Sequence, residues 1–131
     1  MTPIQKQILI VDDDAFLLDM YALKFTQQGF LVATALGSLQ AIERLSEGDY
    51  RPDVLLTDVV MPAMDGFDLI KDLREKSLID KVIVIFLSNL GQQSDIDRGM
   101  ELGADGYIIK ASATPSEVVA RVVEVMEKKE A

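Results

Sequence analysis

Residues 52–66, PDVLLTDVVMPAMDG, contain the pattern that decides the fold. Val54 to Leu56 form a short apolar run with turn residues on both sides, which is typical of a strand buried on both faces. Asp58 follows where this strand should end, and Pro62 prevents regular structure from continuing. Open α/β sheets bind their ligands at the carboxyl ends of their strands. The stretch therefore predicts a buried central strand that presents Asp58 at a binding edge.

The composition excludes several classes of site. At 131 residues the chain fits one domain, and no apolar run approaches the ~20 residues of a membrane span. The start, MTPIQKQ, lacks a signal-peptide pattern. With no cysteine and no histidine, the chain cannot form disulfides, thiolate metal sites, Ser-His or Cys-His catalytic systems, or a phosphohistidine. The net charge of −9 argues against binding nucleic acid. We therefore expect a cytoplasmic domain that binds neither nucleic acid nor membrane.

Further strands and helices are predicted on both sides of the central strand. Strands are expected at residues 7–11, 31–35, 81–87 and 107–109. Helical spacing alternates with these strands. One helix ends near residue 28, two others begin at caps formed by Ser38 and Asp65, and a fourth spans about 92–102. The last helix starts at Pro115 within the capping box Thr114–Glu117. The alternation predicts an α/β fold, a single (βα)5 three-layer sandwich of the flavodoxin-like type. Fold rules give its five-stranded parallel sheet the order 2-1-3-4-5.

Polar side chains follow four of the five predicted strands. Asp12 and Asp13 come after the first strand, Asp58 after the third, Ser88 after the fourth and Lys110 after the fifth. All should meet at one edge of a parallel sheet. Clustered carboxylates without His or Cys suit Mg²⁺, and one carboxylate can act as a nucleophile that forms an aspartyl phosphate. The lysine and the serine would then supply a positive charge and a hydroxyl donor for phosphoryl oxygens.

Each of these residues also has an ordinary structural interpretation. Residues 12–14 could cap the first helix, and Asp58 could belong to a proline turn. Ser88 could be a turn residue, Lys110 a solvated strand-end lysine and Tyr107 a large strand side chain. Their joint placement at one sheet edge favours a site over these separate interpretations.

The chain resembles the receiver domain of two-component response regulators, a CheY-like superfamily, over essentially its whole length. The residues that carry the resemblance are ILIVDDD at 8–14, LLTDVVMPAMDG at 55–66, FLSN at 86–89 and LGADGYIIK at 102–110.

This resemblance implies a phosphorelay function in signal transduction. Asp58 would accept a phosphoryl group from a phosphohistidine on a sensor histidine kinase or a histidine phosphotransfer protein. Mg²⁺ would be held by Asp12, Asp13, Asp58 and the backbone carbonyl of Val60. The domain would catalyse only its own phosphorylation and slow dephosphorylation, and would not be an enzyme in any other sense.

The resemblance also implies how the signal leaves the site. Lys110 would pair with the phosphoryl group, and Ser88 would swing toward it. Tyr107 would change rotamer and alter the face made by the fourth helix, fifth strand and fifth helix, where a downstream protein or a phosphorylation-dependent second copy would bind. The cognate kinase, the downstream target and the oligomeric state do not follow from the sequence, which also fits a monomer.

Two positions depart from the family pattern. The family usually has a proline in a cis peptide after its lysine, whereas Ala111 follows Lys110 here. A cis bond without proline costs about 3–4 kcal/mol, so we expect a trans peptide and a differently shaped loop. The residue after the switch hydroxyl is usually small, and Asn89 at this position should narrow access to the phosphoryl group.

Apolar residues near the site suggest two further expectations. Val60 and Leu90 flank the site and offer no hydrogen bond to an attacking water, so the phosphoryl group should be long-lived. Phe16, Leu18 and Leu23 lie beyond the inner stripe of the first helix and are either scattered surface residues or part of a docking face for a partner helix bundle.

Two alternative functions stay open on the sequence. A Mg²⁺-dependent phosphatase of the haloacid dehalogenase type would use Asp12 and Asp14 as its D-x-D pair, although that family's usual Gly-Thr continuation is missing. A receiver-like adaptor would never be phosphorylated. No glycine-rich turn follows the first strand, which excludes a dinucleotide site. We expect residues 1–131 to hold one receiver domain, with its core at about 7–127 and no output domain, either as a stand-alone regulator or as an excised piece.

Overall fold

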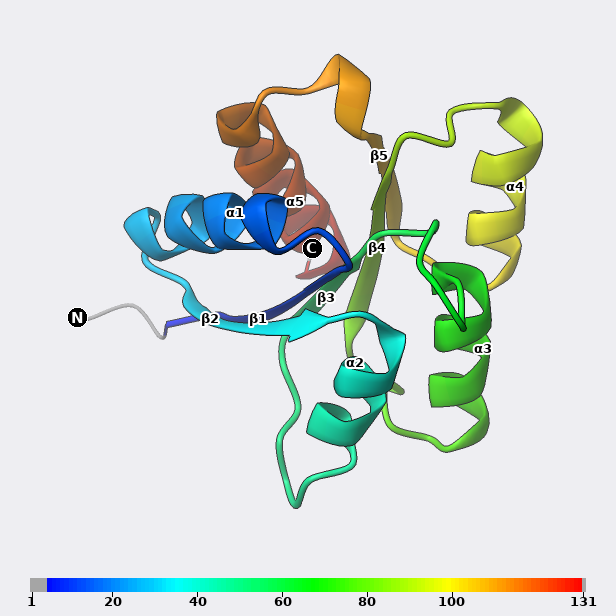
Figure 1. Ribbon diagram of the computed structural model, residues 1–131. Helices are drawn as coiled ribbons and strands as arrows, with labels where there is room; N and C mark the ends of the chain where they lie inside the picture. The colour runs from blue at the N-terminus through cyan, green and yellow to red at the C-terminus, as the bar shows by residue number, and fades with distance from the viewer. Residues whose placement is uncertain (1–4, 131) are drawn as a thin grey trace.

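A computed structural model describes residues 5–130 and shows a five-stranded parallel sheet with helices on both faces (Figure 1). The strand order is β2-β1-β3-β4-β5, which confirms the predicted order and fold class. The strands are β1 (Gln7–Asp12), β2 (Leu31–Leu36), β3 (Val54–Thr57), β4 (Ile83–Ser88) and β5 (Gly106–Ile109). The helices are α1 (Ala15–Gln27), α2 (Ser38–Leu45), α3 (Gly66–Glu75), α4 (Gln93–Glu101), the short 3₁₀ helix η1 (Lys110–Ser112) and α5 (Pro115–Glu130).

The sheet separates two apolar cores. Helices α1 and α5 cover one face, and α2, α3 and α4 cover the other (Figure 1). Val54 and Leu56 of β3 belong to the α1–α5 core, whereas Leu55 between them belongs to the other core. Burial on both faces explains why β3 is a continuous apolar run with no polar alternation. In the described residues, no helix is both long and apolar enough to cross a membrane.

Helix α1 begins at a side-chain cap, and its buried stripe includes Leu18, which the sequence pattern placed outside it. Asp14 Oδ1 accepts hydrogen bonds from the backbone N–H groups of Phe16 and Leu17, at 3.0 and 3.1 Å. The buried positions are Leu18, Tyr21 and Phe25, so the expectation that Leu18 lies on the surface is wrong. These residues have helical spacing of three and four, which places them together on the sheet. The neighbouring positions 17 and 20 lie at the flank and are half-buried.

Helix α2 starts without the side-chain cap predicted for it. Gly37, with a φ of 90°, occupies the N-cap, and Ser38 is already inside the helix. The Ser38 hydroxyl donates to the backbone carbonyl of Met64 at 2.8 Å, and Ser38 is buried. Its role is therefore to join α2 to the loop before α3. Because that partner is distant in sequence, local capping rules could not identify it.

The other predicted caps are confirmed. Asp65 accepts a hydrogen bond from the N–H of Asp68 at 2.8 Å at the start of α3. Thr114 and Glu117 exchange side-chain to backbone hydrogen bonds at 3.0 and 3.2 Å around the first turn of α5. This reciprocal pair satisfies N–H groups that the helix leaves free, which favours helix in spite of the valine-rich sequence.

Two boundaries near the ends of β4 and β5 differ from the prediction. Strand β4 starts at Ile83, because Val82 is held in a turn by a hydrogen bond to Ile79. Lys110 opens the 3₁₀ helix η1, which the sequence did not predict. The peptide between Lys110 and Ala111 is trans, as expected, and residues 5–130 contain no cis peptide.

Candidate functional site

Three carboxylates meet at the carboxyl edge of the sheet. Asp12 ends β1, Asp13 follows it, and Asp58 follows β3. Strands β1 and β3 are neighbours, and the pairing of Val11 with Thr57 places their ends side by side. One oxygen from each carboxylate lies within 4.8 Å of the others. Asp12 and Asp58 are buried, whereas Asp13 is exposed, so the group opens to solvent on one side.

Lys110 closes the buried side of this acidic group. Its Nζ lies 2.8 Å from Asp12 Oδ2 and 2.9 Å from Asp58 Oδ2, and only 10% of its side chain is exposed. Three aspartates and one lysine carry formal charges that leave two negative charges uncompensated. A divalent cation with a preference for oxygen ligands would neutralise them, and the donor set contains only oxygen. The residues present therefore fit Mg²⁺.

Burial and charge act in opposite directions on the two central groups. Burial raises the pKa of the Asp58 carboxyl even though the hydrogen bond and charge of Lys110 act to lower it, and Asp12 adds to the rise. Burial acts to lower the pKa of Lys110, but its bonds to Asp12 and Asp58 outweigh this and the pKa is raised. The lysine has two anionic partners, whereas Asp58 has one cation and one like-charged neighbour. Lys110 is therefore protonated, and a cation beside Asp58 would favour its ionised form.

Backbone contacts fix the orientation of Asp58. Its Oδ1 accepts a hydrogen bond from the N–H of Val59 at 2.7 Å, while its Oδ2 is bound by Lys110. Its own N–H donates to the Val11 carbonyl at 3.0 Å, and its carbonyl oxygen accepts from the Thr57 hydroxyl at 2.9 Å. Both carboxylate oxygens are thus held, and the side chain is presented in one geometry.

Gly66 allows α3 to pack directly on Asp58. Its N–H donates to the Val59 carbonyl at 2.7 Å, and a Cβ built at this position would overlap the carbonyl oxygen of Asp58. The first residue of α3 therefore contacts the backbone that carries the central carboxylate. Only glycine leaves room for this approach.

Replacing Gly66 with alanine should destabilise the protein. Because the added methyl group meets backbone atoms that cannot rotate away, we expect Gly66→Ala to lower the free energy of unfolding by about 1–3 kcal/mol. Urea denaturation measures it. Gly91→Ala is the matched control, since its Cβ would meet only the Ile109 side chain. Equal stability of the two variants would contradict this account.

Two further predicted site residues, Ser88 and Tyr107, bind one loop residue. Ser88 ends β4, and its Oγ accepts a hydrogen bond from the N–H of Leu90 at 3.2 Å. The Tyr107 hydroxyl donates to the Leu90 carbonyl at 2.6 Å. Ser88 is buried and Tyr107 is half-buried. The loop between β4 and α4 is thus bound at Leu90 by a side chain from each of β4 and β5.

The family model for the response regulator receiver domain matches residues 8–123. The chain belongs to this family. Among curated relatives, it is 35% identical over 123 residues to the phosphate regulon transcriptional regulatory protein PhoB of Escherichia coli K12, covering 94% of this chain and 52% of the relative. It is 37% identical over 122 residues to the DNA-binding response regulator MtrA of Mycobacterium bovis, covering 93% of this chain and 51% of that protein. The chain thus spans about half the length of these relatives.

Solved structures confirm the receiver fold. The BeF3-activated receiver domain of DrrB is 27% identical and superposes with a TM-score of 0.80, covering 95% of this chain and 99% of that one. The receiver domain of the Francisella response regulator 1452 is 26% identical with a TM-score of 0.83, covering 95% of this chain and 99% of that one.

The alternative function, a phosphatase that uses Asp12 and Asp14 as its D-x-D pair, is not favoured. The Asp14 carboxylate is outside the acidic group and caps α1 through two backbone N–H groups. It therefore has a structural role. Asp13, at the position between them, joins the acidic group instead.

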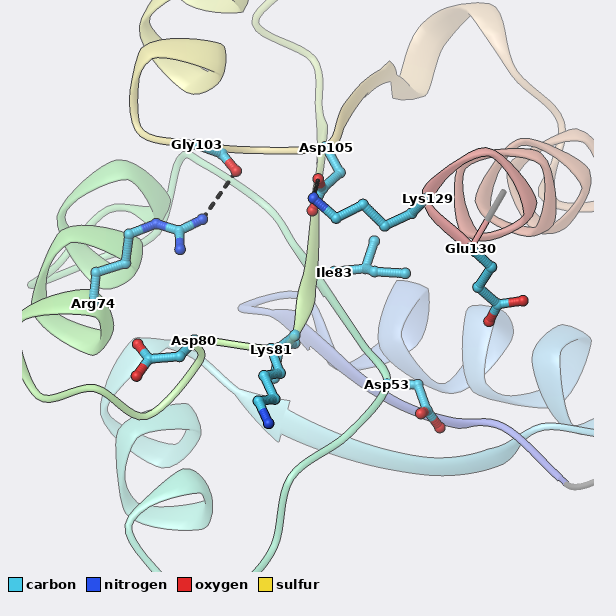
Figure 2. A pocket seen from close by; sticks show the side chains of 10 residues that line it. Asp53, Arg74, Asp80, Lys81, Ile83, Gly103, Asp105, Lys129 and Glu130 are labelled. Atoms are coloured by element: carbon cyan, nitrogen blue, oxygen red, sulfur yellow. Dashed lines mark hydrogen bonds and ion pairs between the residues drawn. The ribbon is translucent and has the colours of Figure 1, made fainter.

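A separate hollow lies at the amino ends of the receiver's strands, on the side of the sheet opposite to the acidic group (Figure 2). It has a volume of about 300 Å³, and several of its charged side chains bind neighbouring groups. Arg74 donates to the carbonyls of Leu102 and Gly103, at 2.7 and 2.9 Å, and Lys129 pairs with Asp105 at 3.1 Å. Such contacts join helix ends to strand ends, so we assign this hollow a structural role.

The sequence did not identify two contributors to the receiver site. These are Thr57, whose hydroxyl binds the Asp58 carbonyl, and Gly66, which contacts the same carbonyl. Leu90 was expected to flank the site, but the sequence did not predict that its backbone binds Ser88 and Tyr107. The Asp-Gly pair at 65–66 was the one local signal available.

Proposed function

We propose that Asp58 is the phosphoacceptor of this receiver domain. The observation that supports it is a buried carboxylate at the end of the central strand, 2.9 Å from Lys110 and grouped with Asp12 and Asp13. An Asp58 oxygen would attack the phosphorus of a phosphohistidine on a partner protein. The new P–O bond forms as the P–N bond breaks, and the leaving imidazole takes up a proton. No general base is needed, because the carboxylate is already a nucleophile.

Mg²⁺ is the proposed cofactor, held by Asp12, Asp13 and Asp58 together with the backbone carbonyl of Val60. When bound, the ion supplies positive charge for the phosphoryl oxygens during transfer. Lys110 supplies a second positive charge from the buried side, where it is already 2.9 Å from Asp58. Positioning and electrostatics would therefore carry the reaction.

The signal would leave through the loop that Leu90 anchors. The Ser88 hydroxyl now accepts from Leu90 N–H, and turning it toward a phosphoryl oxygen breaks that bond. Tyr107, which donates to the Leu90 carbonyl, would change rotamer as the loop moves. This couples a charge change at Asp58 to the α4–β5–α5 face, where a downstream protein would bind.

Incubation with acetyl phosphate and Mg²⁺, followed by intact-mass analysis, tests the proposal. The expected result is a single phosphoryl adduct that appears with Mg²⁺ and not with EDTA. A protein that binds Mg²⁺ but forms no adduct would instead be a receiver-like adaptor that is never phosphorylated. Two curated relatives are named as a transcriptional regulatory protein and a DNA-binding response regulator. We therefore propose that the downstream partner of this domain is also a regulatory protein.

The phosphoryl group on Asp58 should be long-lived. The Val60 side chain is 61% exposed beside the site, and Leu90 is half-buried on the other side. Neither provides a hydrogen bond to hold a water in line with the acyl phosphate. Val60→Asn should therefore shorten the lifetime by about 10-fold or more, because positioned acid–base groups contribute about 10²–10⁴-fold.

Loss of the adduct over time after removal of acetyl phosphate measures this effect. Val60→Thr is a control of similar size with a shorter polar reach. A wild-type lifetime of seconds would contradict the expectation.

A further inference from the structure

One edge of the sheet has open backbone groups in the described part of the chain. Strand β2 lies at the end of the strand order, and β1 is its one strand partner within residues 5–130. The N–H groups of Leu31 and Gly37 donate to carbonyls in and next to β1, at 2.9 and 3.0 Å. Successive residues of a strand direct these groups to alternate sides. The even-numbered residues of β2, among them Val32 and Thr34, therefore present theirs to the outer edge.

Gln40 limits the open segment at one end. Its side-chain Oε1 accepts a hydrogen bond from the N–H of Leu36 at 2.8 Å, which satisfies the last outward donor of β2. The outward groups of Val32 and Thr34 have no such side-chain partner among the recorded hydrogen bonds of residues 5–130. The open edge is thus a short, defined stretch centred on Ala33.

Strand β2 lacks the features that usually keep an edge strand from pairing. Its sequence, LVATAL, contains no charge and no proline, and its six residues pair with β1 without a bulge. Leu31 and Leu36 at its ends are 51% and 46% exposed, and Thr34 is exposed. The other edge strand, β5, has four residues and runs directly into η1. The longer of the two edge strands is therefore β2.

We propose that β2 pairs antiparallel with β2 of a second copy of this chain, across a two-fold axis at Ala33. Val32 of each copy then lies opposite Thr34 of the other, and each such pair exchanges N–H and C=O groups. Leu31 lies opposite Ala35, which sets a large side chain against a small one. A charged residue in this strand would be repeated in the second copy, and the two like charges would repel each other across the interface. The sequence LVATAL contains no charged residue.

This interface is separate from the phosphorylation switch. Strands β2 and β5 are the two opposite edges of the sheet, so the pairing leaves the α4–β5–α5 face free. It needs no phosphoryl group. Two six-residue strands give a small interface, and because interfaces below about 1,200 Å² are at the weak end of the range, we expect a weak dimer that forms only at high protein concentration. Salt should strengthen the dimer, because each copy carries a net charge of −9.

Sedimentation and amide exchange over a concentration range up to millimolar, without phosphoryl donor, test the pairing. The mass should rise from 14.5 kDa toward twice that value, and the amides of Val32 and Thr34 should become protected in parallel. Thr34→Lys should stay monomeric, because a charged side chain on an edge strand opposes pairing and each lysine would lie opposite the apolar Val32 of the other copy. Thr26→Lys, the same change at an exposed position on α1, should dimerise like the wild type.

Two outcomes would overturn the proposal. One is a single 14.5 kDa species at every concentration and salt level. The other is a dimer that Thr34→Lys does not weaken, or that protects amides outside β2, since the interface would then lie elsewhere. Circular dichroism of both lysine variants confirms that they are folded.

Discussion

Asp58→Asn should form no phosphoryl adduct with acetyl phosphate under conditions in which the wild type is fully labelled. The amide has nearly the same shape as the carboxylate, so its oxygen can still accept from Val59 N–H, and the Thr57 hydroxyl still binds the backbone carbonyl of residue 58. It lacks the nucleophilic anion, and no aspartyl phosphate can form at this position. The expected effect is complete loss of labelling, measured by intact mass.

A matched control tests whether the loss of labelling is specific to Asp58. Asp80→Asn makes the same chemical change at an exposed position on the opposite edge of the sheet and should be labelled like the wild type. Full labelling of Asp58→Asn would contradict the assignment. Loss of labelling in both variants would point to a non-specific effect of charge.

Lys110→Met should slow phosphorylation by about 10²–10³-fold, the usual cost of removing one preorganised group that stabilises transition-state charge. The thioether keeps the length of the side chain and removes its positive charge. Lys110 is 2.8 Å from Asp12 and 2.9 Å from Asp58, so no other side chain in residues 5–130 can replace it at both contacts. The rate of adduct formation with saturating Mg²⁺ measures the effect.

The same variant should also become less stable, and Mg²⁺ should restore part of the loss. Without the lysine, two buried carboxylates have no cation between them, and breaking a buried pair in this way costs about 3–5 kcal/mol. Mg²⁺ supplies positive charge to the same group and should raise the Tm of Lys110→Met more than that of the wild type. Lys81→Met, at an exposed lysine, is the control. An unchanged phosphorylation rate in Lys110→Met would contradict the role given to the lysine.

Local signals in the sequence were sufficient for the sheet and its acidic edge. The run at Val54 to Leu56 is apolar because β3 is buried on both faces, and turn residues mark its ends. Since parallel strands all end at one edge, finding Asp58 and Lys110 at strand ends was enough to predict that they meet. Their contact at 2.9 Å confirms it.

The errors arose where several positions had similar local patterns or where the partner was distant. Helix α1 is apolar on most of its surface, so its buried stripe could not be distinguished from its flank, and Leu18 was misplaced. Serine is a residue type that commonly caps helices, but the Ser38 hydroxyl donates its hydrogen bond to the distant Met64 carbonyl. The contact of Gly66 with Asp58 depends on how closely α3 approaches β3, which no sequence pattern encodes.

The central claim is that the phosphoryl group is carried by Asp58, and borohydride trapping tests it most directly. Hydride attacks the acyl carbon of an aspartyl phosphate, phosphate leaves, and further reduction gives homoserine at the labelled residue. Peptide sequencing by mass spectrometry after treatment with acetyl phosphate and Mg²⁺ then locates it. The account predicts homoserine at position 58 alone. Homoserine at position 12 would support the phosphatase chemistry instead. If no aspartate were converted to homoserine, phosphorylation of this domain would be contradicted.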